Sequence, residues 1–157
     1  KNKLIYAIKK SCLIKKYFVT KDVNENNLRM KLNFGHTFAH AIEVKNNYSK
    51  NLTHGEAVLS GMILASRLSL VRKMCTLKTV KLIESIYINN NLSYTFKKFS
   101  NQNSINSLIP YLKNDKKNVD TNINFILIKR IGSLSSPHKN KISTKKLKKY
   151  SKAIAQC

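Results

Sequence analysis

Hydrophobic residues recur at helical spacing through most of the chain. Apolar positions three and four residues apart, with lysine and asparagine between them, predict helices over residues 3–18, 28–44, 53–71, 76–90, 105–113 and 144–155. Thr53 and Glu56 fit a capping box at the start of the third helix, where each side chain accepts a hydrogen bond from the other residue's backbone. Ser104 and Ser143 are expected to cap the last two helices.

One segment has the pattern of a strand. Residues 123–128 are short, apolar and rich in β-branched side chains, whereas residues 132–141 are polar and predict a loop. The sequence therefore predicts a mainly α, multi-helical domain over residues 1–157, with one short strand or β-hairpin near residues 123–131. Small side chains are frequent in the helix over 53–71, which should let a neighbouring helix approach closely.

Length and composition are those of an ordinary globular domain. The chain has 157 residues, 42% of them hydrophobic, which is enough for one core. No apolar run approaches the roughly 18–20 residues that a membrane span needs, and the first residues lack a secretory core. We expect a soluble, cytoplasmic protein with no membrane partner.

The charge is strongly positive, with 30 Lys and Arg against 7 Asp and Glu. Clustered cations favour nucleic acid because they displace counterions from phosphate. Here, however, lysine is spread along the whole chain together with asparagine and isoleucine, and aromatic residues are scattered. Compositional drift is the favoured interpretation, and nonspecific nucleic-acid binding from charge alone stays possible.

Three cysteines, Cys12, Cys75 and Cys157, have no metal-type spacing. Their odd number speaks against a disulfide framework and favours a reducing compartment. We expect two buried thiols and a free one at the chain end.

Three of the four histidines lie between residues 36 and 54. His36 and His40 are four residues apart in a predicted helix, so both rings project from one face, and His54 begins the next helix. Such an arrangement brings two imidazoles to one metal ion and leaves the third for a substrate. Histidine pairs at this spacing are also common in structural positions, so spacing alone leaves both interpretations open.

The residues around the histidines resemble a known family. The runs from Asn33 to Glu43 (N-F-G-H-T-F-A-H-A-I-E) and from Leu52 to Val58 (L-T-H-G-E-A-V), followed by Gly61-Met62, resemble the signatures of 3-dehydroquinate synthases. Upstream, Lys15, Val19, Asp22, Glu25 and Arg29 resemble that family in order and spacing. Downstream, Asp115-Lys116-Lys117 and Ile131-Gly132 resemble its D-K-K and I-G segments. Five of the seven acidic residues lie in these runs, as expected if acids survive where they are needed.

The resemblance implies roles for individual residues. His36 and His54 match two imidazole ligands of a catalytic Zn²⁺ (or another divalent metal such as Co²⁺), with a glutamate of a preceding domain as third ligand. His40 matches a position near the substrate, suited to proton handling or phosphate contact, and Lys15 is the second predicted catalytic residue. The matching substrate-binding positions are Lys15, Arg29, Asn33, His40, Lys116 and Lys117, where Lys116 is preferred but Lys117 stays open.

The implied activity is a multistep lyase reaction of the shikimate pathway. Family members convert 3-deoxy-D-arabino-heptulosonate 7-phosphate to 3-dehydroquinate and phosphate by NAD⁺-mediated oxidation, phosphate elimination, reduction and aldol closure. Fixed cations suit the carboxylate and phosphate of this phosphorylated acidic sugar. The resemblance also implies a homodimer, and an N-terminal NAD-binding domain that this chain lacks, so the chain alone is expected to be inactive.

Nearby residues have simpler interpretations. Glu56 is expected to be a helix cap or a partner of His54 rather than a metal ligand, and Glu43 to be structural. His138 is expected at the surface and Met62 in the core.

Two kinds of alternative stay open. One is another enzyme of the same superfamily, such as a polyol dehydrogenase or a different sugar-phosphate cyclase, although the matching cations favour an acidic phosphorylated substrate. The other is an inactive, basic remnant that associates with nucleic acid.

Overall fold

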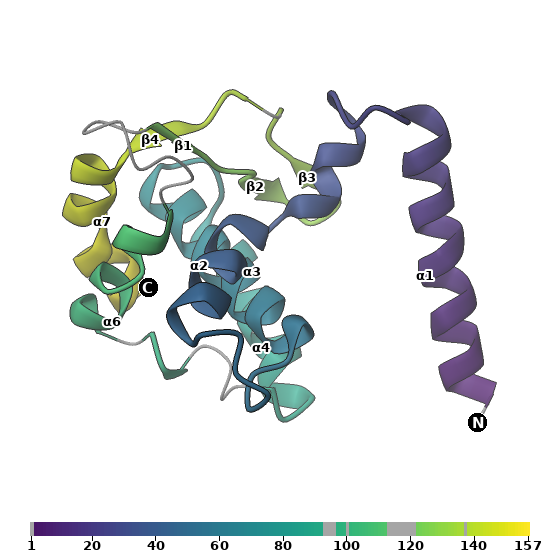
Figure 1. Cartoon of the computed structure of the whole chain (residues 1–157), viewed down its shortest axis with the longest axis horizontal. Coiled ribbons are helices and arrows are strands. Elements are labelled where there is room, and N and C mark those ends of the chain that lie inside the picture. Colours follow the sequence, from purple (N-terminus) through teal and green to yellow (C-terminus); the bar gives the residue numbers. More distant parts are fainter. Residues whose placement is uncertain (1, 93–96, 100, 113–121, 137) are drawn as a thin grey trace.

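Helices make up most of the structure. The computed structural model describes residues 2–92, 97–99, 101–112, 122–136 and 138–157 (Figure 1). Its helices are α1 (Asn2–Lys21), η1 (Arg29–Asn33), α2 (His36–Lys45), α3 (His54–Val71), α4 (Leu77–Asn89), α6 (Gln102–Asn106), η2 (Ile109–Leu112) and α7 (Thr144–Gln156), of which η1 and η2 are 3₁₀ helices. The prediction of a mainly α fold is confirmed.

Helix caps follow the sequence at two of three predicted positions. The backbone N–H of Thr53 donates to Glu56 Oε2 at 2.8 Å, and that of Glu56 donates to Thr53 Oγ1 at 3.3 Å, so the capping box is confirmed. Ser143 caps α7 as predicted. The assignment of Ser104 is wrong, because Asn101 caps α6 by accepting the Ser104 N–H at 2.8 Å. Asparagine is at least as good an N-cap as serine, and it begins the helix earlier.

The β-structure is more extensive than predicted. Among the described residues, β1 (Asn122–Asn124) pairs antiparallel with β4 (Lys141–Ser143), and β2 (Ile128–Arg130) forms a hairpin with β3 (Ser133–Leu134). The hairpin confirms the prediction near residues 123–131. The partner strand β4 was missed, because it is very short and begins inside a polar segment.

The helix predicted over residues 28–44 is broken in two. Gly35 stands between η1 and α2 with a φ of +86°, a left-handed conformation that residues with a side chain rarely adopt. The break makes His36 the first residue of α2.

Helix α3 forms the centre of the core, with α2, α4, α7 and β2 packed around it (Figure 1). Its buried residues cover most of its circumference: Ala57, Ser60, Gly61, Ile63, Leu64, Ala65, Ser66, Arg67, Leu68 and Ser69. Arg67 is buried with its charge matched, because Nη2 lies 2.8 Å from Glu84 Oε1 on α4. Such pairing is the usual condition for burying an arginine.

Small residues let α2 and α3 approach very closely, as predicted. A Cβ atom added to Gly61 would lie 2.2 Å from the Gly35 carbonyl oxygen and 2.9 Å from the Ala39 nitrogen. A Cβ on Gly35 would lie 2.6 Å from the Met62 nitrogen. The contact is therefore one of backbone against backbone.

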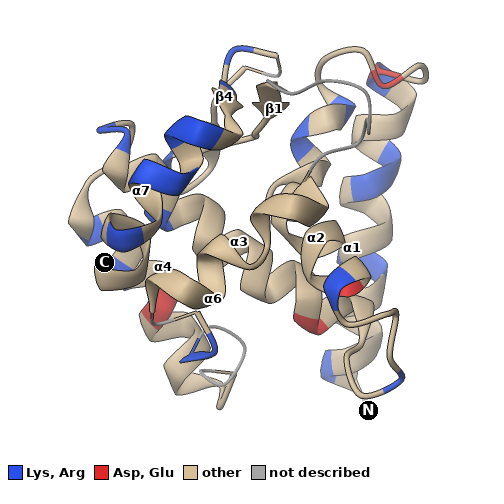
Figure 2. Ribbon diagram, turned by 60° about the vertical axis from the view of Figure 1, so that its left-hand side comes forward, with Lys and Arg blue, Asp and Glu red and all other residues tan. Residues whose placement is uncertain are grey.

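Positive charge is spread over the surface rather than gathered at one place. Figure 2 shows Lys and Arg along α1 and α7 and in the loops, with few acidic residues between them. Within the described part of the chain, no helix is both long and apolar enough to cross a membrane.

We expect Gly61→Ala to destabilise the protein by about 1–3 kcal/mol, because the new methyl group has no room against the start of α2. Urea unfolding of the chain measures the change. Gly55→Ala is the matched control on the same helix, since its Cβ would meet nothing within 4 Å, and it should be neutral or slightly stabilising. Equal unfolding midpoints for both variants would contradict the close helix contact.

Candidate functional site

The turn between α1 and η1 is organised by the carboxylate of Asp22. Its oxygens accept backbone N–H groups of Asn26 at 3.0 Å, Asn27 at 2.8 Å and Arg29 at 2.9 Å. The Arg29 N–H is the strongest of the hydrogen bonds that hold the pKa of Asp22 below its ordinary value of 3.8. Because Arg29 is the first residue of η1, the hydrogen bond from its N–H to Asp22 also sets the position of the η1 side chains.

Glu25 joins two polar side chains of η1, Arg29 and Asn33. Its Oε1 accepts from Asn33 Nδ2 at 2.6 Å, and its Oε2 lies 3.5 Å from Arg29 Nε. Arg29 Nη1 also donates to the Val23 carbonyl at 2.9 Å. Both η1 side chains are thus held in place, with the guanidinium only partly neutralised.

Two of the predicted cations, Lys15 and Arg29, lie in one hollow beside α1. This hollow, of about 460 Å³, is lined by Lys15, Glu25, Arg29, Asn33 and His36 together with apolar and hydroxyl side chains. Lys15 comes from α1 and Arg29 from η1, so the turn at Asp22 brings them to the same space. Two fixed cations and an amide N–H donor suit an anionic ligand.

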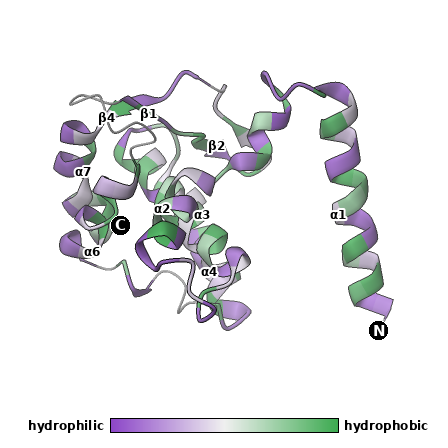
Figure 3. Cartoon of the chain, in the orientation of Figure 1, coloured by the Kyte–Doolittle hydropathy of each residue, from purple (hydrophilic) through white to green (hydrophobic). Residues whose placement is uncertain are grey.

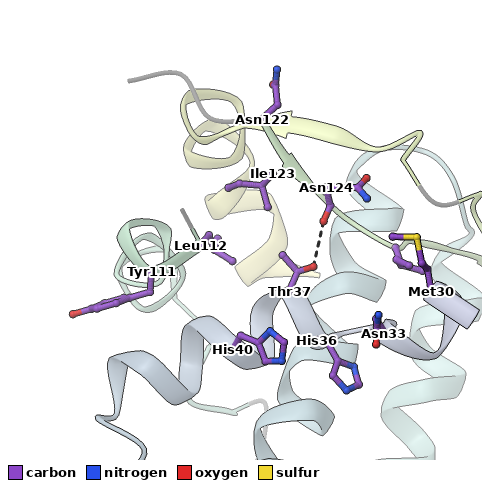
Figure 4. Close-up of a pocket in the computed structure, with 11 residues that line it drawn as sticks. Met30, Asn33, His36, Thr37, His40, Tyr111, Leu112, Asn122, Ile123 and Asn124 are labelled. Carbon is purple, nitrogen blue, oxygen red and sulfur yellow. Dashed lines mark hydrogen bonds between the residues drawn. The ribbon is translucent and has the colours of Figure 1, made fainter. Parts of the chain in front are cut away.

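A second hollow shares part of its lining with the first, and Figure 4 shows the side chains around it. Its volume is about 480 Å³, and Asn33 and His36 line both hollows. His40 lines only the second hollow, opposite residues of η2 and β1. Thr37 Oγ1 donates to the Asn124 carbonyl at 3.2 Å, which ties α2 to β1 across this hollow.

The three clustered histidines lie close together. The ring centre of His36 is 5.8 Å from that of His40 and 5.6 Å from that of His54. The expected placement of His36 and His40 on one helical face, with His54 folded back beside them, is therefore what the structure has. His36 is the central ring. Its distances to His40 and His54 are so similar that they alone do not show which of the two would share a metal ion with it.

His36 is in an environment that keeps its ring neutral. Burial lowers its pKa, because desolvation disfavours the charged imidazolium. The Phe34 backbone offsets part of this shift. The Nδ1 atom of His36 is buried without a hydrogen-bond partner. A neutral imidazole with an unsatisfied nitrogen is the form that binds a metal ion.

His54 is oriented by a carboxylate on the neighbouring helix. Its Nδ1 lies 2.9 Å from Glu43 Oε1, and the Glu43 side chain is largely buried. This bond leaves Nε2 of His54 available. A carboxylate partner is characteristic of histidines that bind metals, because it fixes the ring and its tautomer.

His36 and His54 fit a shared divalent metal ion. Metal–nitrogen bonds of about 2.0–2.1 Å place two ring centres of one tetrahedral site roughly 5 Å apart, close to the observed separation. In the described part of the chain, no group of three His, Cys, Asp or Glu side chains is arranged to hold a metal. The described residues therefore offer two imidazoles here and not a complete coordination shell.

Comparisons with known sequences show which family the chain resembles. Residues 1–118 match the family described as 3-dehydroquinate synthase C-terminal. The chain belongs to the 3-dehydroquinate synthase family. It is 45% identical over 127 residues to the 3-dehydroquinate synthase of Pelagibacter ubique (strain HTCC1062), covering 81% of this chain and 34% of the relative. For that of Endomicrobium trichonymphae, the identity is 43% over 134 residues, covering 85% and 36%. The chain thus spans about a third of the length of these curated relatives.

Solved structures agree on the fold. A 2-deoxy-scyllo-inosose synthase complexed with carbaglucose-6-phosphate, NAD⁺ and Co²⁺ is similar with a TM-score of 0.62 at 22% identity, covering 83% of this chain and 36% of that one. A second structure of a 2-deoxy-scyllo-inosose synthase has a TM-score of 0.65 at 20% identity, covering 88% and 37%. The helices of this chain are thus arranged as in the matching parts of these two structures.

Most residues of the family signatures come together in the structure, but the partners of the carboxylates were not all predicted. Lys15, Arg29, Asn33, His36, His40 and His54 come together as described, whereas Lys116 and Lys117 lie outside the described residues. Glu43 was expected to be structural, and Glu56 to be a helix cap or a partner of His54. The cap is confirmed, because Glu56 caps α3, whereas the carboxylate that bonds His54 is that of Glu43. A signal was available, since Glu43 lies three residues after His40 on the same helical face.

Asp22→Asn should loosen the turn that positions Arg29. An uncharged side chain is a weaker acceptor, so we expect amide hydrogen exchange at residues 26, 27 and 29 to rise by about tenfold near neutral pH. Because the pKa of Asp22 is lowered in the folded state, its contribution is fully present above pH 3.8 and is lost as the pH falls through the lowered value. Exchange that is equally fast in the native protein would contradict this role.

Proposed function

We propose that this chain is the zinc- and substrate-binding half of a 3-dehydroquinate synthase. The reaction would convert 3-deoxy-D-arabino-heptulosonate 7-phosphate to 3-dehydroquinate and phosphate. The observation that carries the proposal is the pair of adjoining hollows that share Asn33 and His36. One hollow has cations for an anionic group, and the other adjoins a histidine pair that fits a metal.

Lys15 and Arg29 would hold the negative charges of the substrate. Arg29 is anchored through its Nε and one Nη to Glu25 and the Val23 carbonyl, which fixes the plane of the guanidinium. The remaining donors can face an anion in the hollow. An anchored cation loses little freedom when the substrate binds, which favours one pose through several steps. Lys116, with Lys117 as the other candidate, would add to this charge.

His36 and His54 would hold the metal, with a third ligand from outside this chain. When bound, the metal supplies Lewis acidity at a substrate hydroxyl, and NAD⁺ held outside the residues of this chain supplies a hydride acceptor and donor. A neighbouring structure that contains NAD⁺, Co²⁺ and a sugar-phosphate analogue supports this cofactor class.

His40 and Lys15 are the proposed catalytic residues. His40 lines the second hollow one helical turn beyond His36, so a substrate that reaches the metal would pass its ring. An imidazole there can accept or return a proton, or hold a phosphate oxygen. Since the third metal ligand and the nucleotide site would lie elsewhere, this half would not turn over substrate alone.

The test uses a fusion that joins the part of the Pelagibacter ubique relative preceding the matched segment to this chain. With NAD⁺ and Zn²⁺ it should release phosphate from the heptulosonate phosphate. His36→Ala and His54→Ala should each lower the rate by roughly 10³-fold or more and lower the bound zinc measured by atomic absorption.

His138→Ala is the matched control, because His138 is exposed in a loop away from the histidine cluster. It should keep both activity and zinc. If all three variants retained zinc equally, the ligand assignment would be wrong.

Glu43→Gln should weaken zinc binding by about 10–100-fold, the usual effect of removing a carboxylate that orients a metal-bound histidine. Competition with a chelating dye measures the affinity on the same fusion. Glu56→Gln provides the comparison, because glutamine also serves a capping box, where Glu56 bonds Thr53. Unchanged affinity in Glu43→Gln would remove Glu43 from the site.

A further inference from the structure

Helix α7 carries lysines along one side. The four residues, named here the lysine face, are Lys145, Lys148, Lys149 and Lys152. At 3.6 residues per turn they fall within about 100° of the helix circumference, and all four are exposed. The buried residues of α7 are Leu147, Ser151 and Ile154. These lie on the opposite side, where α7 packs against α3 and α6, so this packing holds the lysine face toward solvent.

The surroundings of the lysine face add positive charge. The sequence from residue 121 to residue 157 contains no Asp or Glu, and Figure 2 shows α7 with basic residues only. Exposed Lys139 and Lys141 precede the helix, and β4, which includes Lys141, leads directly into α7. Among the described residues, no carboxylate pairs with a lysine of α7. These lysines line neither hollow of the candidate site, so their charge is not part of that site.

The order of charges along α7 is unfavourable for a free helix. The helix dipole favours acidic residues in the first turn and basic residues in the last. In α7 the first turn has no acidic residue and the last turn no basic one, whereas Lys145 and Lys146 lie at the start. Lysines four residues apart, such as Lys145 and Lys149, also repel each other. Compositional drift should avoid such costly positions, and a polyanion bound along the lysine face would remove the repulsion.

Helix α1 also has several lysines, but they are arranged differently. Lys9 and Lys16 follow one line along the helix, and Lys3 and Lys10 follow another about 100° away. None of the residues of α1 is buried, and exposed large apolar side chains lie between its lysines. Figures 1 and 3 show α1 standing apart from the other helices with hydrophobic residues along its length, whereas hydrophilic residues dominate α7. Helix α1 therefore offers lysines of similar exposure without a continuous lysine face.

We propose that the lysine face of α7 binds the phosphate backbone of double-stranded nucleic acid without sequence preference. This role goes beyond the proposed reaction and does not depend on it. From Lys145 to Lys152 the helix rises about 10 Å, a length over which one strand of a duplex presents about three phosphates. Each lysine that neutralises a phosphate releases condensed counterions, so the affinity should fall steeply as salt is added.

The lysine face suits a duplex better than a single strand or a membrane. Proteins that bind single strands offer aromatic side chains on which bases stack. Tyr150, the aromatic residue of α7, is only partly exposed, and the Lys146 ammonium lies over its ring at 6.0 Å. Helices that bind membrane surfaces expose large apolar side chains beside their lysines. The exposed large apolar residues of the described chain all lie outside α7, whereas a duplex backbone needs only the cations.

The experiment compares two variants of the chain that lose the same charge. The lysine-face variant replaces all four residues of the lysine face with glutamine. The matched control replaces Lys3, Lys9, Lys10 and Lys16 on α1 with glutamine. All eight lysines are exposed, and glutamine has nearly the helix propensity of lysine. Fluorescence anisotropy measures binding to a labelled DNA duplex of roughly 20 base pairs, from about 50 to 200 mM KCl.

The lysine-face variant should bind the duplex at least about 30-fold more weakly than the native chain at about 100 mM KCl. Each lost phosphate contact lowers the slope of log affinity against log salt by about 0.9, so this slope should become less steep by about 3 to 4. The control should change it by less than about 1. A duplex of unrelated sequence and an RNA duplex should both bind through the same face, because phosphate contacts carry no sequence information.

A second measurement locates the contact in the native chain. Brief lysine acetylation, followed by peptide mass spectrometry, should slow at the lysine face by at least about fivefold when the duplex is present, and the α1 lysines serve as internal reference. Circular dichroism and urea unfolding check that both variants fold. The lysine-face variant should be at least as stable as the native chain, because its replacement removes like-charge repulsion along α7.

Three results would overturn the proposal. Equal weakening in both variants would make net charge the cause, and protection of α1 rather than α7 would place the contact elsewhere. Tighter binding to phosphatidylserine vesicles than to the duplex at the same salt would assign the face to a membrane. The test is independent of catalysis, because His36→Ala should bind the duplex normally and the lysine-face variant of the fusion should still release phosphate.

Discussion

The close contact between α2 and α3 at Gly35 and Gly61 is the constraint on which the site depends. Gly61 lies against the backbone at the start of α2, and Gly35 turns the chain so that α2 begins at His36. The same contact holds the first turn of α3, with His54, beside that helix start. A single extra carbon at either glycine would separate the helices, and the imidazoles with them.

Patterns that act over a few residues could be predicted from the sequence. The capping box of α3, the cap of α7 and the shared face of His36 and His40 all depend on neighbouring positions, and all are present in the structure. The break at residue 35 was missed because the hydrophobic spacing continues across it. Strand β4 was missed because a short strand is stabilised by a partner far away in sequence.

The residues of the candidate site also differ in how well the sequence predicted them. The family signatures identified the cations and the histidines, but not which carboxylate supports which side chain, since that depends on how α2 and α3 cross. Glu43 bonds His54 across the two helices, and Glu25 joins two residues of η1 from the preceding turn. The uncovered state of α1 also went unforeseen: Cys12 was expected to be a buried thiol and is exposed, because the amphipathic pattern indicates that a helix needs a partner but not where the partner is.

The few carboxylates of the described residues all have defined partners, in a chain that is rich in lysine and asparagine. Asp22, Glu25, Glu43, Glu56 and Glu84 all accept hydrogen bonds, respectively in a turn, at η1, at a histidine, in a cap and at a buried arginine. None of these five is an idle surface acid. Replacing any of these five with alanine would break a defined hydrogen bond, so the acids in the described part of the chain are held in place by their contacts.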